Sequence, residues 1–195
     1  MKTFEISGQV RDQVGATQAK ATRHNGMVPA VMYGEGENLH FDVPTLVLEK
    51  LLSSSDTHLI KVDLQGKTHT AVLREVQYHT VSDEIIHIDL YAVKENKPFE
   101  VSLPILFQGT SKGVLAGGTL VKKLRSLKVV GTIETLPERV TVDISNLELG
   151  KTIKVKDISV EGITIRTASS AAIVTIDIPR SLRGDKAAEA TPGKK

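Results

Sequence analysis

Short runs in which apolar and polar residues alternate recur along most of this chain of 195 residues. In residues 3–10, Phe4 and Ile6 would point to one side of a strand while Glu5 and Gln9 point to the other. Residues that favour turns, mainly glycine, proline, asparagine and serine, stand between successive runs. Strands at such short spacing are typical of antiparallel sheets and barrels rather than of β–α–β units. The sequence therefore predicts a mainly β protein with a few short helices.

A charged and polar run at residues 94–98, KENKP, is the predicted boundary between two domains. Residues 1–93 are predicted to form a small antiparallel sheet or β-barrel with one clear helix, which would begin at Pro44. Residues 94–180 are predicted to form a β-rich domain of antiparallel strands, either sandwich-like or an open barrel. Residues 181–195 lose the apolar pattern, so we expect a disordered tail there.

The composition excludes several classes of site. Without cysteine, the chain has no disulfide, no thiolate metal site and no cysteine nucleophile. No apolar run reaches membrane-spanning length or resembles a secretion signal, so we expect a soluble cytoplasmic protein. The net charge of +2 is too small to indicate nucleic-acid binding by itself. Residues 1–93 carry 8 Lys and Arg against 12 Asp and Glu, so any anion-binding surface there must be local.

One polar, cationic segment between two strands differs from the rest of the pattern. Residues 11–26 contain almost no large apolar side chain, and their basic residues are Arg11, Lys20, Arg23 and His24. Residues 15–25 could form one or two helical turns, with Thr17 as the N-cap and Gly26 just after the end. Because such a segment has no core-facing stripe, we expect it to be held by something that it touches, and its cations indicate an anion. The alternative is a solvated loop with ordinary surface cations.

Several further patterns are candidates for chemistry. The glycine-rich residues 109–118 have the spacing of neither a P-loop nor a dinucleotide fingerprint, so a flexible loop between strands is predicted there. His87 and Asp89 share a strand face, but without a nucleophile nearby a polar surface is favoured over an acid–base pair. Tyr33 and Tyr78 could stack on bases or fill the edge of a core. A second basic cluster is also available to phosphates, and consists of Lys122, Lys123, Arg125 and Lys128.

Three stretches, in order along the chain, resemble a known family. The cationic segment and the run GMVPAVMYG at 26–34 are similar to the N-terminal signature of bacterial large-subunit ribosomal protein L twenty-five. The runs VQYH at 76–79 and HIDL at 87–90 resemble that family's Q-x-H and H-V/I-D-F/L pattern. The third match is similar to the two-domain form called CTC or general stress protein, and comprises Gly117-Gly118, Leu136-Pro137, VDIS at 142–145, Leu147, Gly150 and Asp157. The resemblance covers residues 3–178.

The resemblance implies a β-barrel-like domain that binds 5S rRNA, followed by a β-rich domain. The barrel would dock on an internal loop of 5S rRNA and its neighbouring minor groove, through contacts to phosphates and to the groove edge. Carried over by position, the RNA-binding residues would be Arg11, Lys20, Arg23, His24, Tyr33, Gln77, His79, His87 and Asp89.

The expected function is that of a non-enzymatic constituent of the large ribosomal subunit. Its partners would be 5S rRNA and neighbouring ribosomal proteins in the cytoplasm. We expect no cofactor, no metal, no membrane contact and a monomer when free. The alternative is a two-domain β protein that acts as a stress-related protein–protein interaction module. An enzyme built on His87 and Asp89 ranks third.

Overall fold

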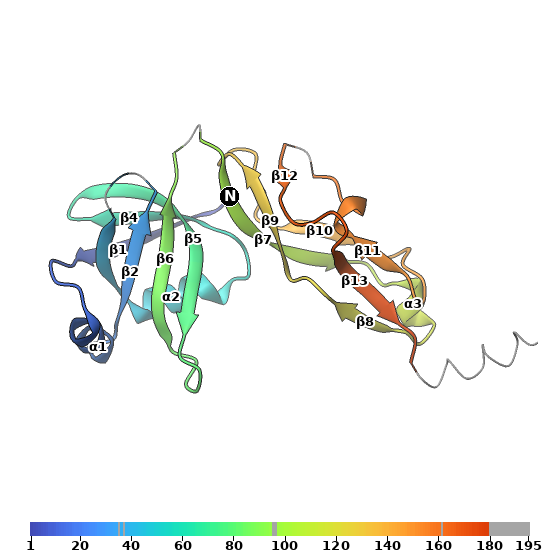
Figure 1. Ribbon diagram of the computed structural model, residues 1–195, viewed down its shortest axis with the longest axis horizontal. Helices are drawn as coiled ribbons and strands as arrows, with labels where there is room; N and C mark the ends of the chain where they lie inside the picture. Colours follow the sequence, from blue (N-terminus) through green and yellow to red (C-terminus); the bar gives the residue numbers. More distant parts are fainter. Residues whose placement is uncertain (35, 37, 95–96, 161, 180–195) are drawn as a thin grey trace, which may run out of the picture. The chain divides into compact units, whose positions relative to one another are not determined.

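The computed structural model describes residues 1–34, 36, 38–94, 97–160 and 162–179 (Figure 1). The chain divides into two compact units. The first unit contains residues 1–103 together with 129–138 and 162–164. The second contains residues 104–128, 139–160 and the described residues from 165 onward. The tail predicted at 181–195 lies outside the described residues.

Six strands of the first unit close into a barrel in the order β1-β3-β2-β6-β5-β4. Their bounds are β1 Thr3–Val10, β2 Met27–Tyr33, β3 Leu39–Pro44, β4 Leu59–Leu64, β5 Lys67–Tyr78 and β6 Ile85–Ala92. The predicted barrel is therefore confirmed. The expectation that its strands are all antiparallel is wrong, because β1 pairs in parallel with β4, and β2 in parallel with β6. Parallel neighbours need a long crossover, and each of these pairs is joined through other strands and a helix.

The barrel is filled by side chains from alternate positions of its strands. Phe41, Ile60 and Ile88 are fully buried there, as the predicted alternation requires. Helix α2 (Thr45–Ser53) adds Leu48 and Leu51 to the same core and begins one residue after Pro44. Burying each of these large side chains contributes about 1.5–3 kcal/mol. The interior therefore fixes which residues of each strand face outward.

The second half of the chain is also β-rich, as predicted. One sheet has the order β10-β7-β9-β12, with β7 Phe99–Gln108, β9 Ser126–Gly131, β10 Val140–Asp143 and β12 Thr164–Ile165. A second has the order β11-β13-β8, with β8 Thr119–Lys122, β11 Thr152–Lys154 and β13 Ala172–Asp177. A 3₁₀ turn, η1, covers Val155–Asp157. The pair β7–β10 is parallel, which corrects the expectation of antiparallel strands throughout. A sandwich-like packing of the two sheets stays a prediction.

The glycine-rich residues 109–118 do not form the flexible loop that we expected. They contain a short helix, α3 (Lys112–Leu115), capped by Ser111. Ser111 Oγ accepts hydrogen bonds from the backbone N–H groups of Gly113 and Val114 and donates one of 2.7 Å to the carbonyl of Leu147. A buried serine with all of these bonds orders the segment, which glycine content alone did not indicate. Within the described residues, no helix is both long and apolar enough to span a membrane.

Candidate nucleic-acid interface

The cationic segment forms a helix on the outside of the barrel. Helix α1 (Ala16–His24) packs against β2, and none of its residues is buried. Lys20, Arg23 and His24 are exposed. The last two lie in the final turn, where a cation near the carbonyl end of a helix stabilises it by about 0.3–1 kcal/mol. The surface of α1 is thus polar and basic, with no apolar face toward the core.

The cap of α1 differs from the prediction. Gly15 is the N-cap, rather than Thr17, and its φ of 147° is a backbone conformation that favours glycine. Gly26 does follow the end of the helix, with a φ of 71°. Its carbonyl accepts hydrogen bonds from both the N–H and the Oγ1 of Thr45, over 3.1 and 2.9 Å. The end of α1 is therefore joined directly to the start of α2.

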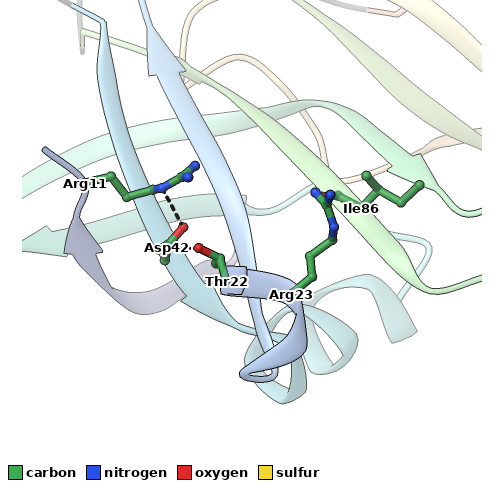
Figure 2. A network of polar contacts seen from close by, with 5 residues as sticks. All are labelled: Arg11, Thr22, Arg23, Asp42 and Ile86. Atoms are coloured by element: carbon green, nitrogen blue, oxygen red, sulfur yellow. Dashed lines mark hydrogen bonds and ion pairs between the residues drawn. The ribbon is translucent and has the colours of Figure 1, made fainter. Parts of the chain in front are cut away.

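Polar contacts hold α1 against the barrel (Figure 2). Thr22 Oγ1 donates a hydrogen bond of 3.2 Å to Asp42 Oδ2 on β3. Arg23 Nη1 donates a longer one, of 3.4 Å, to the carbonyl of Ile86 on β6. The expectation that this segment is held by what it touches is thus met in part by the protein itself. The remaining surface of α1 stays open to a partner.

Arg11 is placed differently from the other predicted cations. It lies just after β1, with its side chain only 10% exposed, and its Nε is 3.2 Å from Asp42 Oδ1. Its Nη2 is buried and has no hydrogen-bond partner among the described residues. Asp42 is therefore an anchor for both Arg11 and Thr22. Sequence reasoning missed Asp42, although its outward position between the buried Phe41 and Val43 could have indicated it.

Three predicted residues come together on the outer face of the barrel. Gln77 on β5 lies directly opposite His87 on β6, so the two side chains point to the same side. His87 Nδ1 is 2.7 Å from Asp89 Oδ1, and both side chains are about one-quarter exposed. The carboxylate lies beside Nδ1, but the contact does not have the geometry of a hydrogen bond. The prediction that these two residues share a strand face is confirmed.

His79 lies apart from that row, in the turn between β5 and β6. Its Nδ1 accepts a hydrogen bond of 3.2 Å from the backbone N–H of Ser82 and lies 3.0 Å from Ser82 Oγ. An open groove of about 1310 Å³ runs between this turn, α1 and α2. Its lining includes Lys20, Arg23, His24, Tyr78 and His79. His79 and the cations of α1 therefore border one groove.

The two tyrosines have different environments. Tyr33 is half-buried and packs edge-on against Tyr91, with ring centroids 5.9 Å apart. Tyr33 lies opposite Tyr91, which is two residues beyond Asp89 on β6. Tyr33 is therefore about 7 Å along the sheet from Asp89. Tyr78 is 49% exposed at the groove. The ring of Tyr78 is thus more accessible for stacking on a base, while Tyr33 fits the alternative in which it fills the edge of the core.

The arrangement of these side chains is suited to binding. Among the described residues, no group of three or more His, Asp or Glu side chains is placed to hold a metal ion. His87 and Asp89 lie on an open sheet face with one predicted partner, Gln77, and with cationic α1 beside them through Arg23. Exposed cations next to side chains that can both donate and accept hydrogen bonds are suited to phosphates and base edges.

Comparisons with known proteins agree with this geometry. The ribosomal L25p family model matches residues 6–90, and the model of the C-terminal domain of ribosomal protein TL5 matches residues 98–180. The large ribosomal subunit protein bL25 of Phocaeicola vulgatus is 39% identical over 100% of both chains. The protein of that name from Bacteroides thetaiotaomicron is 37% identical over 96% of this chain and 98% of its own. The bL25 protein of Cytophaga hutchinsonii is 37% identical, over 97% and 99%.

The chain belongs to the ribosomal L25p family. The match of both family models in order shows that it has the two-domain form. The L25p family is one of ribosomal proteins and not of enzymes, which removes the enzyme alternative built on His87 and Asp89.

Proposed function

We propose that this protein is a constituent of the large ribosomal subunit in the cytoplasm and binds 5S rRNA through the outer face of its barrel. The observation that carries the proposal is the hydrogen bond from Arg23 to the carbonyl of Ile86. It places the cationic helix α1 beside His87, the next residue along β6. The exposed cations of α1 would then contact phosphates of an RNA whose base edges meet the row of hydrogen-bonding side chains.

The members of this surface have separate roles. Lys20, Arg23 and His24 are exposed and would contact phosphates. Gln77, His87 and Asp89 would face the minor groove, where 2′-hydroxyls and base edges are displayed. Arg11 would act mainly by positioning α1, since its side chain is only 10% exposed and its Nε lies against Asp42. The names of the relatives support this reading over a stress-related protein–protein module.

We also propose that residues 1–93 and 94–180 are separate domains. The two family models, which end at 90 and begin at 98, support a boundary in the run 94–98. All six barrel strands and α2 lie before residue 93. The first domain therefore contains the whole proposed binding surface.

The test is binding of the full chain to 5S rRNA across a salt series, with Lys20→Ala/Arg23→Ala alongside. Each phosphate contact contributes about 0.7–0.9 to the slope of log affinity against log salt, so the double variant should flatten that slope by about 1.5. Lys61→Ala/Lys67→Ala is the matched control, because both residues are exposed, Lys61 lies on β4 opposite β2 in the barrel order, and Lys67 is at the start of β5, ten residues before Gln77. Equal slopes for the wild type and the first variant would contradict the proposal.

A further inference from the structure

The longest stretch of this chain without a carboxylate runs through the second unit. No Asp or Glu occurs between Glu100 and Glu134. The same stretch holds five cations, which are Lys112, Lys122, Lys123, Arg125 and Lys128. Four of these five lie within seven consecutive residues, 122–128, from the end of β8 to the start of β9.

The backbone that carries these four cations is fixed along its length. The N–H groups of Lys123 and Leu124 both donate to the carbonyl of Ile173, over 2.9 and 3.1 Å. The carbonyl of Arg125 accepts a hydrogen bond of 3.0 Å from the N–H of Ile105. The cations are therefore presented on an ordered turn, which lowers the entropy that a ligand must remove.

Their side chains are free for a ligand. All four are exposed, and none forms an ion pair with a carboxylate of the described residues. Lys122 Nζ lies 5.3 Å from the centre of the Phe107 ring, so the aromatic ring, rather than an acid, supports this ammonium. Arg11 and Arg74 of the barrel, by contrast, each have a carboxylate partner.

Arg166 adds a further cation to the surface formed by residues 122–128. The N–H of Arg166 donates a hydrogen bond of 2.9 Å to the carbonyl of Lys128, and Thr167 Oγ1 accepts one of 3.0 Å from the N–H of Lys128. Arg166 is exposed, and this backbone contact places it beside Lys128, directly after β12. Like charges on adjacent strands repel one another and destabilise the free protein, and a polyanion removes that repulsion.

We propose that residues 122–128 with Arg166 form a second RNA-binding surface, which binds the phosphate backbone of an RNA helix without reading its sequence. The surface offers charge on a rigid turn but none of the His, Gln or Asp side chains that the barrel presents to base edges. It is separate from the proposed 5S rRNA site. Together the two surfaces give one chain two attachments to RNA, and each raises the effective concentration of RNA at the other.

The experiment measures binding of the full chain to an RNA duplex of about 30 base pairs with no 5S sequence, across a salt series. The variant K122Q/K123Q/R125Q/K128Q should reduce the salt slope by about three and the affinity by at least about tenfold near 0.1 M salt. The control K61Q/K67Q/K151Q/K156Q removes the same charge from exposed positions elsewhere. It should change the slope by less than about one. Equal effects of the two variants, or no effect of the first, would overturn the proposal.

Two further measurements keep the result interpretable. Because Lys122 covers Phe107, the charge-retaining variant K122R/K123R/K128R is tested too and should bind the duplex as the wild type does.

Lys20→Ala/Arg23→Ala should lower the affinity for 5S rRNA while leaving most of the duplex binding. If duplex binding survives and 5S binding is absent in the wild type, the barrel proposal fails and this one stands. If K122Q/K123Q/R125Q/K128Q binds the duplex as the wild type does, the surface serves a partner other than RNA.

Discussion

Thr22 Oγ1 donates a hydrogen bond of 3.2 Å to Asp42 Oδ2 and so joins helix α1 to β3. The other oxygen of the same carboxylate lies 3.2 Å from Arg11 Nε. A helix with no buried residue gains little from the hydrophobic effect, so these polar contacts are what fixes its position. One acidic residue, Asp42, therefore joins the basic helix α1 to β3 and to Arg11.

Asp42→Ala should destabilise the barrel by about 2–3 kcal/mol, because it leaves the largely buried Arg11 without its counter-charge. The free energy of unfolding in urea measures this loss. Amide hydrogen exchange in α1 should also accelerate, since Thr22 loses its acceptor. Glu5→Ala is the control: Glu5 is exposed on β1 and should change stability by less than about 0.5 kcal/mol. Unchanged exchange in α1 would show that Asp42 does not hold the helix.

His87 and Asp89 should act as a unit in RNA binding. With Nδ1 and Oδ1 only 2.7 Å apart, the two side chains are close enough for the effects of removing them to be coupled. We expect His87→Ala and Asp89→Ala to weaken 5S rRNA binding, and the double variant to lose no more than the worse single variant. A double-mutant cycle should therefore give a coupling of about 0.5–3 kcal/mol. Gln77→Ala combined with Lys61→Ala serves as an uncoupled pair. Strictly additive losses for His87 and Asp89 would rule out a shared role.

The carboxyl of Asp143 gives the second half of the chain an acid-sensitive contact. Hydrogen bonds from Ser145 Oγ, of 2.6 Å, and from its backbone N–H, of 2.8 Å, hold the pKa of Asp143 below its ordinary value of 3.8. A carboxyl with a lowered folded-state pKa stabilises the fold above pH 3.8 and loses this contribution as the pH falls through its folded-state value.

Ser145→Ala removes one of these donors, so the pKa of Asp143 should rise toward 3.8. NMR titration of the Asp143 side chain in both proteins measures the change. The stability difference between the wild type and the variant should be greatest above pH 4 and shrink at lower pH. Asp63→Asn is a suitable reference on the barrel, because within the described residues the carboxylate of Asp63 accepts one backbone hydrogen bond, from Gly66. A difference that grows toward low pH would contradict the assignment.

Much of the barrel could be predicted because apolar and polar residues alternate along parts of its strands. The outward and inward positions around Phe41 and around Ile88 follow directly from a period of two. The shared face of His87 and Asp89 follows from the same rule. The turn at Gln65-Gly66, where both residues have positive φ, is of the kind that glycine favours between two strands.

What could not be predicted depends on contacts between residues distant in sequence. Nothing near β1 indicates that Phe4 lies beside Ile60 in a parallel pair. Thr17 has the residue type of an N-cap, but the chain needs the backbone freedom of Gly15 to leave β1 and enter α1. Ser111 orders a glycine-rich segment through the carbonyl of Leu147, which is 36 residues away. The anchoring role of Asp42 was missed for the same reason.

The parallel pairing of β2 with β6 has a consequence for synthesis of the protein. Synthesis of β2 ends at Tyr33, but β6, which pairs with its other edge, is not fully synthesised until Ala92. At about 5–20 residues per second, β2 would wait roughly 3–12 s for that partner. During this time its apolar run has one open edge, which can pair with another nascent chain. The barrel is therefore most exposed to misassembly while it is still being translated.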